Sequence, residues 1–183
     1  IYTAYRKRNL SQKTLKNIRG DLSGFCNYLD ASDIRSDLRT SNIKIPANAK
    51  KSKKQALDVS SLDILFSESQ VPYNGAICQD SLIYAYRFQV VTGLRPGELM
   101  GLEWGDIDND YIHIRRAINA HGITTTGKNE TAARDFPQTK HTREILECQK
   151  MYRIDPKDPH ERIFGYTGQL CYRKRWSIYC KYN

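Results

Sequence analysis

An interruption of the hydrophobic pattern between residues 45 and 54 divides this chain into two parts. The interruption has the sequence IPANAKKSKK, which combines one proline and a cluster of lysines with no periodicity of apolar residues. Such composition is typical of a linker. We therefore expect one domain in residues 1–45, a basic linker in residues 46–57 and a second domain in residues 58–183.

The positive charge of the chain lies before and within this linker. Residues 1–57 carry 13 Lys and Arg against 4 Asp and Glu, which accounts for the whole net charge of +9. Residues 58–183 carry 16 residues of each sign. Clustered cations favour a polyanionic partner, because contacts with phosphates release counterions. A solvated lysine-rich face would produce the same count, so the charge alone leaves both interpretations open.

The first part contains the pattern of one amphipathic helix. Ser11 is a suitable N-cap residue. Three cations, Lys13, Lys16 and Arg19, fall on or near the polar side. Apolar residues follow at spacings of three and four, which predicts a helix with one buried face: Leu15, Ile18, Leu22, Phe25, Cys26 and Leu29.

Helix signals also begin the second part. Ser60 or Ser61 is expected to cap a short helix, and a longer apolar helix is expected over residues 80–91. Gly93 should end that helix, because glycine tolerates the left-handed conformation found beyond helix ends. Pro96 then suits the first turn of another short helix, where its missing N–H is not needed.

Strand signals follow in the middle of the second part. Residues 111–118 alternate apolar and polar side chains, and residues 123–126 and 133–137 form two shorter strand-like pieces. Helices are expected at about residues 143–152 and 172–182. We therefore predict an α+β fold that is mostly helical and contains a small three-stranded antiparallel sheet.

Several classes of protein are not indicated by the sequence. No apolar run approaches the roughly 18 residues of a membrane span, and no signal peptide begins the chain, so we expect a cytoplasmic protein. The histidines and cysteines are scattered without the spacing of a metal site, so we assign no metal. Because the chain begins at Ile1 instead of methionine, we expect a fragment of a longer protein.

Two cations stand out as candidates for chemistry. Arg95 lies between two predicted helices, beside proline and glycine, where restricted backbone can aim its planar guanidinium at two phosphate oxygens. From spacing alone we favour a simpler interpretation, in which Arg95 only pairs with Glu98, Asp106 or Asp108. Lys128 lies on a Gly-Lys-Asn turn, where a lysine is more often solvated than catalytic.

The combination of two segments changes this balance. Residues 92–99 have the sequence TGLRPGEL and residues 102–108 the sequence LEWGDID. Together they resemble the first arginine motif of tyrosine recombinases, the phage integrase family. The hairpin of that family is similar to the second segment, in which Lys128 is followed by Ala132, Arg134 and Pro137. The likeness covers most of the chain: about residues 11–45 resemble the second half of the helical, SAM-like core-binding domain, and residues from 56 onward resemble the catalytic domain.

This resemblance implies a site-specific DNA recombinase that breaks and rejoins strands through a 3′-phosphotyrosyl intermediate. Arg95 would stabilise the phosphorane transition state, Glu98 would orient Arg95, and Lys128 would protonate the leaving 5′-oxygen. Neither metal nor nucleotide cofactor is implied. The partner would be double-stranded DNA, with no membrane or small-molecule substrate. Seven cations are the expected DNA contacts: Lys13, Lys16, Arg19, Lys50, Lys51, Lys53 and Lys54.

Other parts of the family pattern are absent from the sequence. The His-x-x-Arg box and the nucleophilic tyrosine would follow Asn183, so we expect a fragment that binds DNA, lacks catalysis and is monomeric, taken from a parent that acts as a tetramer. His160 and Arg162 have the wrong spacing for that box. One alternative is a non-catalytic DNA-binding module or a degenerate integrase. Another is a basic nucleic-acid-binding protein in which the Arg95 segment is a chance similarity.

Overall fold

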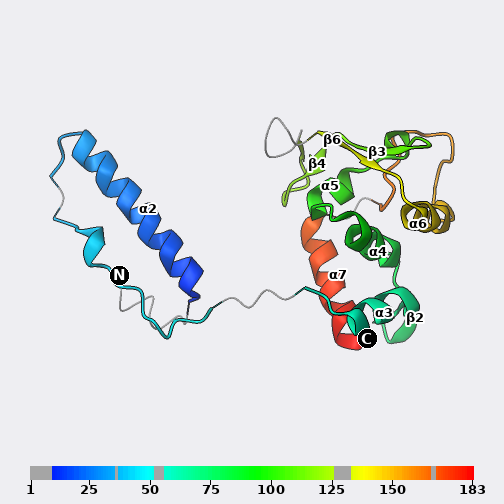
Figure 1. The fold of residues 1–183 in the computed structure, drawn as a ribbon, viewed down its shortest axis with the longest axis horizontal. Coiled ribbons are helices and arrows are strands. Elements are labelled where there is room, and N and C mark those ends of the chain that lie inside the picture. The colour runs from blue at the N-terminus through cyan, green and yellow to red at the C-terminus, as the bar shows by residue number, and fades with distance from the viewer. Residues whose placement is uncertain (1–9, 36, 52–55, 126–132, 166–167) are drawn as a thin grey trace. The chain divides into compact units, whose positions relative to one another are not determined.

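The computed structural model divides the chain into two compact units, residues 1–56 and 57–183 (Figure 1). It describes every residue except 1–9, 36, 52–55, 126–132 and 166–167. Three of the predicted functional residues, Lys53, Lys54 and Lys128, therefore lie outside the described residues.

In the first unit, helix α2 (Gln12–Ala31) packs against a single 3-10 turn, η1 (Thr40–Asn42). The side chain of Ser11 accepts a hydrogen bond from a backbone N–H of the first turn, which confirms the predicted N-cap. The predicted buried face is only partly present. Cys26 is buried, but Phe25 is 56% exposed, because η1 covers only part of the apolar side of α2.

The second unit begins with helix α3 (Val59–Ser67), whose N-cap differs from the prediction. Asp58 is the N-cap, and its Oδ1 accepts a 2.8 Å hydrogen bond from the backbone N–H of Ser61. Ser60 and Ser61 lie inside the helix, and the Ser60 hydroxyl donates to Asp58. A carboxylate is as good a cap as a hydroxyl, and here it stands at the position that precedes the helix.

A hairpin that the sequence analysis did not predict follows α3. It pairs β1 (Gln70–Tyr73) with β2 (Ala76–Gln79) in antiparallel register. Asn74 and Gly75 join the strands, with φ angles of 49° and 81°. Positive φ at both positions is the signature of the tight turn that Asn-Gly favours.

The next two helices begin and end close to the predicted residues. Helix α4 (Ile83–Thr92) ends at Gly93, which has φ of 66°, and α5 (Pro96–Gly101) begins at the predicted proline. The core of this unit forms around α4. The buried residues of α4 are Ile83, Ala85, Tyr86 and Phe88.

The expected sheet is not one three-stranded sheet in the described residues. Strand β3 (Tyr111–Ile114) pairs with β6 (Arg134–Pro137), and β4 (Ala117–Ile118) pairs separately with β5 (Thr124–Thr125). The predicted strand 111–118 is interrupted at Arg115 and Arg116, after the last ladder pair at Ile114. The Arg116 guanidinium pairs with Glu103 at 3.1 Å and with Asp106 at 2.6 Å.

Two helices complete the unit, α6 (Lys140–Lys150) and α7 (Gln169–Tyr182), close to their predicted ranges. A short 3-10 turn, η2 (Trp104–Asp106), follows α5. Arg175 of α7 pairs at 2.6 Å with the fully buried Asp80, which ties α7 to the start of α4. The α+β class is therefore confirmed. None of the helices in the described part of the chain has the length and hydrophobicity to cross a bilayer.

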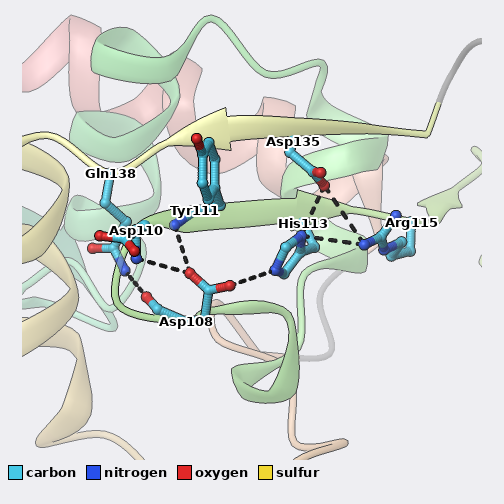
Figure 2. A network of polar contacts seen from close by, with 7 residues as sticks. All are labelled: Asp108, Asp110, Tyr111, His113, Arg115, Asp135 and Gln138. Carbon is cyan, nitrogen blue, oxygen red and sulfur yellow. Dashed lines mark hydrogen bonds and ion pairs between the residues drawn. The ribbon is translucent and has the colours of Figure 1, made fainter.

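Polar contacts hold the outer face of the β3–β6 ladder (Figure 2). His113 Nδ1 lies 2.7 Å from Asp135 Oδ1, and Nε2 lies 2.9 Å from Asp108 Oδ2. These hydrogen bonds, first to Asp135 and then to Asp108, raise the pKa of His113. Nη2 of Arg115 lies 3.2 Å from His113 Nδ1 and 3.6 Å from the same Asp135 oxygen, so it belongs to the same network. The network fixes β6 to β3.

We expect the stability that His113 contributes to depend on pH. Because its folded pKa lies above the ordinary 6.5, this stability is complete below that value and is lost as the pH rises through the folded pKa. The difference in urea midpoint between the wild type and His113→Asn should therefore shrink between about pH 5.5 and about pH 8.5. Tryptophan fluorescence reports this unit alone, since Trp104 and Trp176 both lie in it.

His141→Asn is the matched control, because its side chain is 73% exposed on α6. The control should show little change in midpoint across the same range. A difference for His113→Asn that stays constant with pH would contradict the ion-pair interpretation.

Candidate active site

Two glycines allow α5 to lie directly against β4 (Figure 1). A Cβ atom on Gly97 would lie 2.7 Å from the backbone oxygen of Ile118, and one on Gly101 would lie 3.0 Å from that of Arg116. Only glycine permits so close an approach of two backbones. The N-terminal end of α5, where Arg95 is the N-cap residue, is thereby fixed relative to β4.

Glu98 is the centre of a cluster of two arginines and one carboxylate. Its Oε1 accepts hydrogen bonds from Nη1 of Arg95 at 3.0 Å and from Nη1 of Arg134 at 3.1 Å. Its Oε2 accepts from the backbone N–H of Arg95 at 3.0 Å and from Nη2 of Arg134 at 2.9 Å. Both carboxylate oxygens are therefore bound twice.

The three side chains differ sharply in exposure. Glu98 is 5% exposed, whereas Arg134 is 41% and Arg95 is 71% exposed. Burial alone would raise the pKa of Glu98, but hydrogen bonds from Arg134 and from the backbone and side chain of Arg95 outweigh burial and lower it. The carboxylate therefore stays ionised at neutral pH while the Arg95 guanidinium faces solvent.

The structure shows which of the three predicted acidic residues pairs with Arg95. Arg95 pairs with Glu98, as one interpretation predicted, whereas Asp106 pairs with Arg116 at 2.6 Å and Asp108 with His113. The pairing is not exclusive, because Arg134 also binds the same carboxylate.

Arg134 was part of the hairpin pattern but was not predicted as a site residue. It stands at the first position of β6, 36 residues after Glu98. No local spacing signals a contact over that distance. The hairpin pattern was the only signal in the sequence that could have directed attention to it.

The remaining predicted residues lie apart from this cluster in the sequence. Lys13, Lys16 and Arg19 are exposed on α2, as expected for the polar side of that helix, and Lys50 and Lys51 are exposed at the end of the first unit. The backbone oxygen of Lys50 accepts a 2.8 Å hydrogen bond from the N–H of Gln12, so this part of the linker is joined to the start of α2.

A cavity of about 370 Å³ lies at the other end of the β3–β6 ladder from Arg134. Two of its three cations are already paired with glutamates, Lys150 with Glu147 and Arg153 with Glu161. We therefore place the candidate site at Glu98 and not in this cavity. The cavity is lined by Trp104, Ile107, Asp108, Asn109, Gln138, Arg143, Leu146, Glu147, Lys150 and Arg153.

Two tyrosines of α7 serve packing, whereas Tyr182 is exposed. Tyr172 and Tyr179 are buried against Tyr86, and their hydroxyls donate to Gln89 Oε1 at 2.6 Å and to Glu68 O at 2.9 Å. Within the described residues, no group of three or more His, Cys, Asp or Glu side chains is placed to hold a metal ion. The chemical group that the site presents is an exposed, oriented guanidinium.

Comparison with known proteins gives matches among solved structures. No family model and no curated protein sequence matches the chain. A complex of a Tn1549 transposon integrase variant with transposon right end DNA superimposes with a TM-score of 0.66 at 20% identity, over 86% of this chain and 50% of that chain. The same integrase with circular intermediate DNA gives a TM-score of 0.64 at 20% identity, over 86% and 51%.

The present chain thus spans about half the length of the integrase structures that it matches. The superposition covers most of the described residues, and the arginine motif and the hairpin pattern occur in the order that the resemblance requires. The chain has a tyrosine recombinase fold.

Proposed function

We propose that this chain is part of a site-specific DNA recombinase of the integrase type, which moves a mobile element by breaking and rejoining DNA strands. The observation that carries the proposal is the exposed Arg95 guanidinium, which forms an ion pair with the buried carboxylate of Glu98. The solved integrases of the same fold are complexes with transposon DNA, which supports DNA as the partner. The compartment would be the cytoplasm.

The proposed chemistry is a phosphoryl transfer to tyrosine. The tyrosine hydroxyl attacks a phosphodiester, a 3′-phosphotyrosyl bond forms, and the bond to the 5′-oxygen breaks. A 5′-hydroxyl from a second strand later reverses the step, so neither a metal nor a nucleotide cofactor is required. The phosphorane carries extra negative charge, and Arg95 is placed to meet it with two N–H donors in one plane.

Lys128 is proposed to protonate the 5′-oxygen as it leaves. It lies outside the described residues, three positions after Thr125 of β5 and six before Arg134 of β6.

The first unit is proposed to bind the DNA backbone. Its exposed cations, with those of the linker, would contact phosphates and thereby set position more than sequence. The proposed contacts are Lys13, Lys16, Arg19, Lys50, Lys51, Lys53 and Lys54. Assembly as a tetramer on two duplexes is part of the same proposal.

Substitution of either proposed catalytic residue should separate cleavage from binding. In the protein expressed to the end of its reading frame, Arg95→Ala or Lys128→Ala should lower DNA affinity by no more than the loss of one phosphate contact, and should lower single-turnover strand cleavage by about 10²-fold or more. Covalent protein–DNA adducts, resolved on denaturing gels, measure the cleavage. Arg143→Ala is the control, since that guanidinium donates a hydrogen bond to the backbone oxygen of Asn109.

Two results would speak against the proposal. Loss of binding with unchanged cleavage per bound complex would remove the assigned roles of Arg95 and Lys128. A reading frame that encodes neither a His-x-x-Arg box nor a later tyrosine would leave a DNA-binding module without this chemistry.

Charge removal on α2 should weaken DNA binding in a salt-dependent way. The triple change Lys13→Gln, Lys16→Gln, Arg19→Gln removes up to three phosphate contacts, so the slope of log K against log salt should fall in magnitude by about 2.7. The control removes the same charge from the second unit, at Lys140, Lys150 and Lys157. Equal losses in the two triple variants would show a net-charge effect and not a binding face.

A further inference from the structure

We propose that Arg134 is a positioning residue that neutralises Glu98 and so leaves the charge of Arg95 available to a DNA phosphate. This inference rests on the proposed function of Arg95. It adds a residue that does not itself touch the DNA, and it explains why the candidate site contains two arginines for one carboxylate.

The hydrogen bonds show an unequal division of Glu98 between its partners. Arg134 binds it with a fork, Nη1 to Oε1 at 3.1 Å and Nη2 to Oε2 at 2.9 Å. The Arg95 side chain makes one contact, Nη1 to Oε1 at 3.0 Å, and its second contact comes from the uncharged backbone N–H. A bidentate pair is the stronger of the two arrangements. Arg134 is therefore the main counter-ion of Glu98.

The charges of the cluster follow from this division. One arginine and one glutamate would form a neutral pair, and such a pair attracts an anion weakly. Two arginines and one glutamate carry one net positive charge, and the more exposed partner is Arg95, at 71% against 41%. An incoming phosphate therefore meets an uncompensated cation whose direction Glu98 still controls.

Arg134 and Arg95 lie on different elements, β6 and the start of α5. Arg134 pairs across the ladder with Ile114 at the first position of β6, and the His113 network holds the same ladder through Asp135. The position of the Arg134 guanidinium is thus set by the β3–β6 ladder, while that of Arg95 is set by α5. Glu98 is held from both sides.

A competing assignment would make Arg134 a second phosphate contact, since its side chain is 41% exposed. The two assignments differ when Glu98 loses its charge. If Arg134 acts only as a counter-ion, Glu98→Gln should make it dispensable. If Arg134 touches phosphate, Glu98→Gln should not restore the DNA binding that Arg134→Gln loses.

The test measures binding of this chain to a mixed-sequence DNA duplex by fluorescence anisotropy over a range of salt. Arg95→Gln removes one phosphate contact, so the slope of log K against log salt should fall in magnitude by about 0.9. Arg134→Gln should lower it by a similar amount, because Glu98 then neutralises Arg95. The double variant Arg134→Gln, Glu98→Gln should recover the slope of the wild type.

Arg143→Gln is the matched control, since it removes one arginine charge from α6 and should keep the slope of the wild type. Urea unfolding followed by tryptophan fluorescence establishes that each variant is folded. A double variant that stays as weak as Arg134→Gln would overturn the proposal in favour of direct contact. An unchanged slope in Arg134→Gln would overturn it as well.

A second measurement distinguishes failure of the counter-ion assignment from failure of the proposed function of Arg95. If Arg95→Gln binds DNA with the slope of the wild type, the assigned role of Arg95 fails. The counter-ion assignment is then judged from the pKa of the Glu98 carboxyl, measured by ¹³C NMR. This pKa should be higher in Arg134→Gln than in the wild type, because the variant lacks the Arg134 hydrogen bonds that oppose the effect of burial. An equal pKa in the two proteins would overturn the counter-ion assignment.

Discussion

A buried carboxylate organises the second unit around its exposed arginine. Removing Glu98 from water is unfavourable unless hydrogen bonds and opposite charge replace the lost solvation. Four donors provide this, and they come from two elements that are distant in the sequence, the start of α5 and the start of β6. The need to satisfy one carboxylate therefore joins the start of α5 to the start of β6.

The parts of the fold that were predicted correctly depend on local chemistry. Gly93 ends α4 and Pro96 begins α5 because backbone conformation at those positions is restricted within one or two residues. The strand over residues 111–118 was predicted too long, since alternation along the chain does not indicate that Arg116 pairs with Glu103 and Asp106, which lie outside the strand. The hairpin around Asn74 had a local signal that the sequence analysis did not use.

The candidate site was predictable only in part, for a related reason. Arg95 and Glu98 are neighbours across one helical turn, so spacing alone indicates their contact. The contact between Glu98 and Arg134 joins residues 36 positions apart, and no pattern of charge along the chain distinguishes Arg134 from the other arginines of this unit. Exposure could not be predicted either, because it depends on which neighbours cover each side chain.

The seating of α5 on β4 has a consequence for interpreting related sequences. A glycine close to an arginine in a phosphate-binding motif is readily taken as a residue that lets the ligand approach the backbone; here Gly97 follows Arg95 by two positions. Gly97 serves a different purpose here, because the space that a methyl group would need is filled by the main chain of Ile118. In a homologue with this seating, alanine at that position would displace the start of α5, and with it the N-cap arginine, although the alanine itself would touch no ligand.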